Sequence, residues 1–126
     1  MIFASGKQGK VSVIISPLTK VTRLVNPSVV DIGTPEQLIV SFGPYITGDS
    51  IDAENDVVSA TSQTIDGQTY YVYELLTPFA LSGAHNVAAL TFKGGVSVLC
   101  VASATDKQWD AGKSDLLKIV QSFRIG

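Results

Sequence analysis

The chain has 126 residues and a mass of 13.3 kDa, and nine Lys and Arg against eleven Asp and Glu give a formal charge of −2. This length predicts one domain, and 45% apolar with 16% charged residues is too hydrophobic for a disordered chain. Scattered basic residues argue against electrostatic nucleic-acid binding, and no apolar run approaches the roughly 18 residues of a spanning helix. One cysteine, Cys100, excludes an internal disulfide and a cysteine-built zinc site.

The first third of the chain is expected to contain strands and a long loop. Residues 10–16 are rich in β-branched side chains and predict a strand, with residues 2–4 as a candidate partner. Residues 17–33 show no sustained periodicity and predict a long loop with at most a short turn, where a partner surface is expected. Because strand-like sequence begins at once, with no signal or transit peptide before it, we expect the natural N-terminus to lie further upstream.

A short helix is expected next. Thr34, Pro35 and Gln37 form a helix start with a capping box. The dipeptide Gly43-Pro44 is expected to break or kink this helix. The acidic stretch 49–56 lacks the glycine and the closing carboxylate of a calcium loop, so it is interpreted as a solvated loop.

Two hairpins and a helix are predicted downstream. Strands 57–65 and 68–76 flank Asp66-Gly67, and strands 85–93 and 96–104 flank Gly94-Gly95, both suited to two-residue turns. Both faces of the second hairpin are apolar, so we expect the sheet to be covered on both sides. An amphipathic helix closes the chain, because apolar residues recur at helical spacing: Trp109, Leu116, Leu117, Val120 and Phe123. This order predicts an α+β fold with an antiparallel sheet.

Motifs for catalysis are incomplete. Residues 112–114 resemble the end of a phosphate loop but lack its upstream glycine. With one histidine in the chain, a His-paired nucleophile would have to be Cys100, which is expected mid-strand as a buried, inert thiol. The aromatic run 70–73 and Trp109 are interpreted as packing residues.

One pair of residues could form a functional site. Pairing Lys93 with Val96 across the second turn places His85 opposite Ala104, with Asp106 as its diagonal neighbour, roughly 7–8 Å away between Cβ atoms. The imidazole and the carboxylate could bond to each other and hold the sheet end to the last helix, or share a weakly held divalent ion. A small enzyme that uses this pair for catalysis is a further hypothesis for the function.

Several segments, in order, have a familiar pattern. They are 11–16 and 31–36, then Tyr-Val-Tyr-Glu with Leu-Leu-Thr at 71–77, His85, the glycine turn at 94–95, Ala-Thr-Asp-Lys-Gln-Trp at 104–109 and Ser-Phe at 122–123. Together they resemble the PsbP family of thylakoid-lumen photosystem proteins, and the likeness covers nearly the whole chain.

The resemblance implies an α/β/α sandwich around a central antiparallel sheet, the PsbP/Mog-like fold. It implies a non-catalytic, extrinsic protein of the chloroplast thylakoid lumen that binds a photosystem complex at the lumenal membrane face. Such proteins support the oxygen-evolving complex of photosystem II or act as assembly factors. No cofactor is required; weak binding of calcium, manganese or zinc is expected at His85 and Asp106, and partner binding at Lys107 and Trp109.

The sequence also departs from the family pattern. Gly94, Thr105 and Gln108 replace usual family residues and indicate a divergent relative. Residues 1–126 are expected to form a single PsbP-like domain that lacks the N-terminal strands of the full domain, and an edge exposed in this way could produce a homodimer by strand exchange. The alternative function is a Mog-type regulator of nuclear transport that shares the fold and binds a small GTPase.

Overall fold

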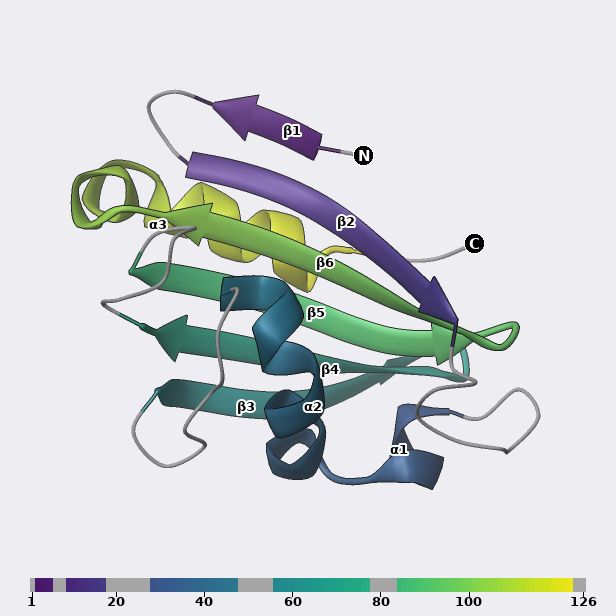
Figure 1. Ribbon diagram of the computed structural model, residues 1–126. Helices are drawn as coiled ribbons and strands as arrows, with labels where there is room; N and C mark the ends of the chain where they lie inside the picture. The colour runs from purple at the N-terminus through teal and green to yellow at the C-terminus, as the bar shows by residue number, and fades with distance from the viewer. Residues whose placement is uncertain (1, 6–8, 18–27, 48–55, 78–83, 124–126) are drawn as a thin grey trace.

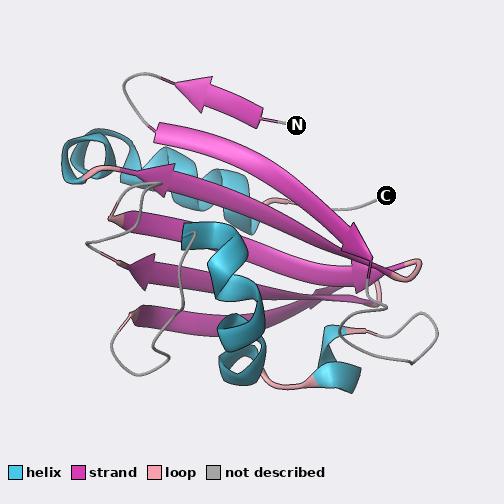
Figure 2. Ribbon diagram, in the orientation of Figure 1, coloured by secondary structure: helices cyan, strands magenta, loops and turns pink. Residues whose placement is uncertain are grey.

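The computed structural model describes residues 2–5, 9–17, 28–47, 56–77 and 84–123. They form one six-stranded antiparallel sheet with helices on both faces (Figures 1 and 2). The elements in chain order are β1 (Ile2–Ser5), β2 (Gly9–Pro17), α1 (Val29–Ile32), α2 (Pro35–Thr47), β3 (Val57–Ile65), β4 (Gln68–Leu76), β5 (His85–Lys93), β6 (Val96–Ala104) and α3 (Asp106–Gln121). The strand order is β1-β2-β6-β5-β4-β3, and the layering confirms the predicted α/β/α sandwich.

Both predicted hairpins are confirmed, with the expected strand boundaries. Asp66 and Gly67 have φ of 52° and 79°, and Gly94 and Gly95 have 64° and 77°, as a type I′ turn requires at both central residues. The second turn pairs Lys93 with Val96. The predicted pairing of residues 2–4 with the next strand is also confirmed, since β1 lies antiparallel to β2.

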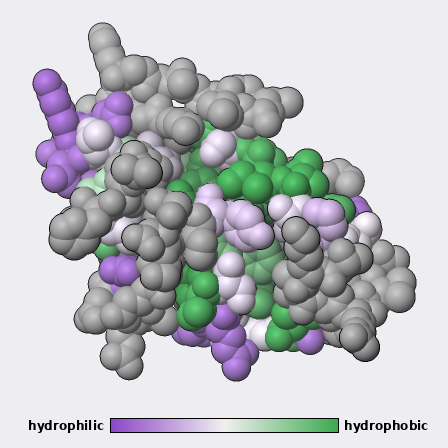
Figure 3. All heavy atoms as spheres, viewed as in Figure 1, coloured by the Kyte–Doolittle hydropathy of each residue, from purple (hydrophilic) through white to green (hydrophobic). Residues whose placement is uncertain are grey.

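Helices α1 and α2 cover one face of the sheet, which we call the α2 face. Its buried core joins Leu38 and Phe42 of α2 to sheet residues that include Leu90, Phe92 and Val101. The space-filling view of this face shows hydrophobic side chains that reach the surface among polar ones (Figure 3). Val40 of α2 is one exposed hydrophobic residue.

Of the break or kink expected at Gly43-Pro44, the break is wrong, because α2 continues through both residues to Thr47. Proline removes the hydrogen bond to the residue four positions earlier, here Val40. Val40 is 54% exposed, so its carbonyl lies on a side of the helix that water can reach. Phe42 and Ile46 are buried in the core before and after the proline, and this packing favours an uninterrupted helix.

Helix α3 covers the other face, which we call the α3 face. Trp109, Leu116 and Val120 pack on the sheet through small residues that include Ala89, Cys100 and Ala102. These short side chains let the helix axis approach the strands closely. No helix in the described part of the chain is long and apolar enough to cross a membrane.

Two predicted loops are described only in part. Of residues 17–33, Pro17 ends β2, and residues 28–33 contain the short helix α1. Residues 18–27 lie outside the described residues, as does the acidic stretch except for Asp56.

Candidate functional site

The start of α3 is fixed by its own sequence. Thr105 accepts a hydrogen bond at Oγ1 from the backbone N–H of Gln108 (3.3 Å), and the Gln108 side chain accepts one from the Thr105 N–H (3.0 Å). This reciprocal capping box makes Asp106 the first helical residue. A carboxylate in the first turn also interacts favourably with the helix dipole.

The sheet brings His85 to this helix start. His85 opens β5 and pairs with Ala104, the last residue of β6, directly before the cap. Its Nε2 lies 2.7 Å from Oδ1 of Asp106, a hydrogen bond that becomes an ion pair when the imidazole is protonated. The predicted proximity of the two side chains is therefore confirmed, and with it the register from which it was derived.

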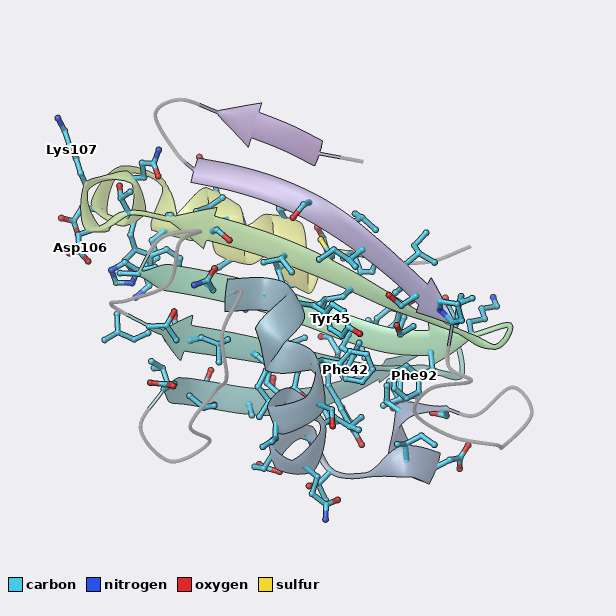
Figure 4. The ribbon with its side chains drawn as sticks, in the orientation of Figure 1. Phe42, Tyr45, Phe92, Asp106 and Lys107 are labelled. Carbon is cyan, nitrogen blue, oxygen red and sulfur yellow. The ribbon has the colours of Figure 1, made fainter. Side chains whose placement is uncertain are left out.

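The side chains of His85 and Asp106 differ in their exposure to solvent. The Asp106 side chain is 85% exposed and that of His85 only 18%. Asp106 and Lys107 project from the first turn of α3 at one end of the sheet (Figure 4). The carboxylate can therefore contact another molecule while it keeps its hydrogen bond to the less exposed imidazole.

An aromatic stack supports the imidazole. The His85 and Trp109 rings lie parallel, 6° apart in orientation with centroids 4.8 Å apart. Lys113 Nζ lies 5.6 Å from the Trp109 centroid, within cation–π range. Trp109 is only 7% exposed, which confirms its interpretation as a packing residue and makes it a support for His85.

The pair does not form a closed metal site. In the described residues, no group of three His, Cys, Asp or Glu side chains lies together. His85 and Asp106 supply two ligands, whereas structural zinc takes four and calcium six to eight. Nε2 of His85 and Oδ1 of Asp106 are already bonded to each other, so the described residues do not fit a resident metal.

Two residues beside this site were not predicted from the sequence. Lys113 lies one helical turn after Trp109, a spacing that places the two on one side of the helix. Leu76 pairs with His85 across β4 and β5 and is 41% exposed, so it adds apolar surface beside the imidazole. The connection between these two strands is long, and no turn dipeptide revealed their register.

Cys100 lies outside this site. It is buried in the α3-face core, as expected for a packing thiol. Burial raises the pKa of the Cys100 thiol to about 11, because the thiolate loses its hydration there.

The arrangement of sheet and helices is one that a solved structure shares. Cyanobacterial PsbP (CyanoP) from Synechocystis sp. PCC 6803 aligns with 94% of this chain and 68% of its own, at a TM-score of 0.63 and 24% sequence identity. This likeness establishes a PsbP-type fold.

Sequence comparison then establishes the family. The sequence model of the PsbP family matches residues 4–125, and the chain belongs to that family. It is 46% identical over 123 residues to the Arabidopsis thaliana protein named PsbP domain-containing protein 6, chloroplastic, and 33% identical over 125 residues to PsbP domain-containing protein 4, chloroplastic.

These alignments cover 98% of this chain in both cases but 47% and 45% of the relatives. The chain thus spans about half the length of the curated relatives it matches. The matches give no support to the Mog-type alternative.

Proposed function

We propose that this chain is a non-catalytic accessory domain of the chloroplast thylakoid lumen that binds a photosystem complex or an assembly intermediate of one. The family match over residues 4–125 carries the proposal. Two relatives named as chloroplastic support the compartment. A non-catalytic role agrees with the burial of Cys100, the one thiol of the chain, in the middle of β6.

The start of α3 is the contact surface we propose. The exposed Asp106 carboxylate and the adjacent exposed Lys107 present opposite charges side by side. The His85–Trp109 stack holds Asp106 in place, so less side-chain freedom is lost on binding. Trp109 acts by positioning the other residues, since its own ring is buried.

Binding is tested with purified photosystem I and photosystem II complexes and the chain with a small affinity tag. We expect saturable binding to one complex, weakened about tenfold by Lys107→Glu because a rim charge is inverted. Lys118→Glu is the matched control, since Lys118 is exposed on the same helix near its other end. No binding to either complex would refute a photosystem partner. Equal binding by both variants would place the contact away from the start of α3.

Weak divalent binding at His85 and Asp106 is part of the proposal. An ion would have to replace the bond between Nε2 and Oδ1, so its affinity would be low and exchange fast. Calorimetric titration of calcium, manganese and zinc into wild type and His85→Ala tests this. Heats that are small and equal in both proteins would exclude the site.

A further inference from the structure

Strand β3 forms one edge of the sheet. It pairs with β4 on one side, and no other strand of the described part of the chain pairs with its outer side (Figure 1). Ser62 and Thr64, which share the α2 face with buried Tyr71, are exposed, so α2 leaves this part of the edge open. Thr61, on the opposite face, is also exposed.

The edge lacks most of the usual protection against pairing. Natural edge strands are shortened, charged or interrupted by proline, because unpaired N–H and C=O groups attract another strand. β3 is nine residues long, has the sequence VVSATSQTI and carries neither a charge nor a proline. Its one irregularity is a bulge between Val57 and Ser59. The opposite edge, β1, has only four residues.

The hairpin turn determines which backbone groups of β3 point outward. A two-residue turn at Asp66-Gly67 makes Ile65 and Gln68 a hydrogen-bonded pair. Hydrogen-bonded and non-hydrogen-bonded pairs then alternate along the strand. The backbone groups that face away from β4 therefore belong to Ala60, Ser62 and Thr64.

We propose that two copies of this chain pair through β3, antiparallel, with Ser62 opposite Ser62 of the second copy. Ala60 then lies opposite Thr64 on either side of the two-fold axis, and each of these opposed pairs exchanges two backbone hydrogen bonds. The two sheets become one, and no segment leaves its own sheet, which distinguishes this dimer from strand exchange.

Charges at the ends of β3 select this register. If Thr61 lay opposite Thr61, Asp66 of one copy would come close to Asp56 of the other at the ends of the two strands, and like charges close together are destabilising. With Ser62 on the axis, Asp66 lies near Val58 instead, and Asp56 lies past the hairpin turn of the other copy, because the chain leaves β3 at Ile65. The other registers that use the same outward groups fail for a different reason. Centred on Ala60 the ladder reaches the bulge, and centred on Gln63 or Thr64 it reaches the turn.

A second copy fits this edge because the edge is self-complementary. An uncharged strand meets its own image with no like-charge repulsion between the paired residues, and Val and Thr favour extended backbone. An extended segment of another protein would use the same backbone groups. It is the competing occupant that the experiment must separate.

Sedimentation equilibrium of the chain alone, over a wide concentration range, tests the proposal. We expect a reversible monomer–dimer equilibrium in the wild type. Ser62→Lys and Ser62→Glu each place like charges at the axis, and each should raise the dissociation constant at least about tenfold. Mixing the two variants should restore dimers, since Lys then faces Glu. In a register where Ser62 does not face Ser62, no such rescue is expected.

Ser114→Lys is the matched control, because Ser114 is exposed on α3, away from β3, and the charge change is the same. It should dimerise like the wild type. A wild type that stays monomeric at every concentration overturns the proposal and leaves the edge to an extended segment of another protein. Variants that dimerise unchanged, or a mixture without rescue, also overturn it. Because only the chain itself is measured, failure here leaves photosystem binding untouched.

Discussion

His85 is held in two ways, by a carboxylate at Nε2 and by an indole against its ring face. The hydrogen bond partner is exposed and the indole is buried, so the two interactions contribute differently to stability. A hydrogen bond in contact with water adds little, whereas an aromatic stack also removes apolar surface from water.

Two substitutions at His85 separate these contributions. His85→Ala removes both interactions and should lower the free energy of unfolding by about 1–2 kcal/mol. His85→Phe keeps a ring against Trp109 and should lose less than about 1 kcal/mol. Urea unfolding followed by tryptophan fluorescence measures both. Equal losses in the two variants would show that the stack contributes nothing.

Cys100 gives a prediction at alkaline pH. Its pKa is raised from 9.0 to about 11 by burial, so the folded protein keeps the neutral thiol while the unfolded chain ionises. Ionisation of the unfolded chain favours unfolding. The contribution of the neutral, buried thiol to the free energy of unfolding is therefore complete below pH 9 and is lost as the pH rises to about 11. Between these limits, wild type should lose stability more steeply than Cys100→Ala. Buried tyrosines contribute equally to both proteins, and parallel curves in urea unfolding would contradict the shift.

At residue scale, the sequence predicted proximity better than orientation. The Gly94-Gly95 turn fixed the register, and the register placed His85 near Asp106. Nothing local indicated that the imidazole would lie flat on Trp109, because that contact depends on how closely α3 approaches the sheet.

Among the elements, α3 depends most on its start. The Thr105–Gln108 capping box supplies partners for N–H groups that have none within the helix, and it sets the position of Asp106. The same Ser/Thr-x-x-Gln pattern predicts a helix start at Thr34, but at Thr105 it was missed, because the last helix was predicted only from its apolar spacing from Trp109 onward.

Thr105→Ala should therefore cost about 1 kcal/mol of stability, the usual loss for an N-cap threonine. It should also weaken the His85–Asp106 bond by fraying the first turn. Ser114→Ala, an exposed substitution inside the same helix, should be neutral or slightly stabilising because alanine favours helix. Thermal unfolding by circular dichroism compares the two. A Thr105→Ala melting curve that overlies the Ser114→Ala curve would show that the cap is dispensable.

Helix α2 shows where element prediction fails. Gly43-Pro44 is unfavourable in an isolated helix, and local propensity alone predicts a break. Burial of Phe42 and Ile46 against the sheet overrides that preference. Such packing involves residues far away in the sequence, so no local pattern reveals it.

For the whole molecule, layering was predictable because each hairpin carries its own signal. Alternate residues of β5 and β6 were apolar on both faces, and each face is indeed covered by a helix. What attaches the α2 layer was not predictable, since it uses side-chain hydroxyls and backbone carbonyls that only the assembled fold brings together. Tyr71 donates to the Gly33 carbonyl and Tyr73 to the Pro35 carbonyl, both at 2.7 Å.

These two hydroxyls hold Gly33 and the start of α2 against β4. On the opposite face α3 is attached by its packed core and by two exposed hydrogen bonds, His85–Asp106 and Gln63–Gln121. Replacing both tyrosines with phenylalanine keeps the rings in the core and removes only the hydroxyls, at a cost of about 1 kcal/mol each. We expect the backbone amides of α2 to exchange with solvent about tenfold faster or more, because local opening of this layer becomes easier. The exchange rate of the α3 amides should change only as far as the global stability changes.

Hydrogen exchange followed by mass spectrometry resolves residues 35–47 from residues 106–121. Equal acceleration in both helices would mean that the two layers open together and that the tyrosines stabilise the molecule as a whole.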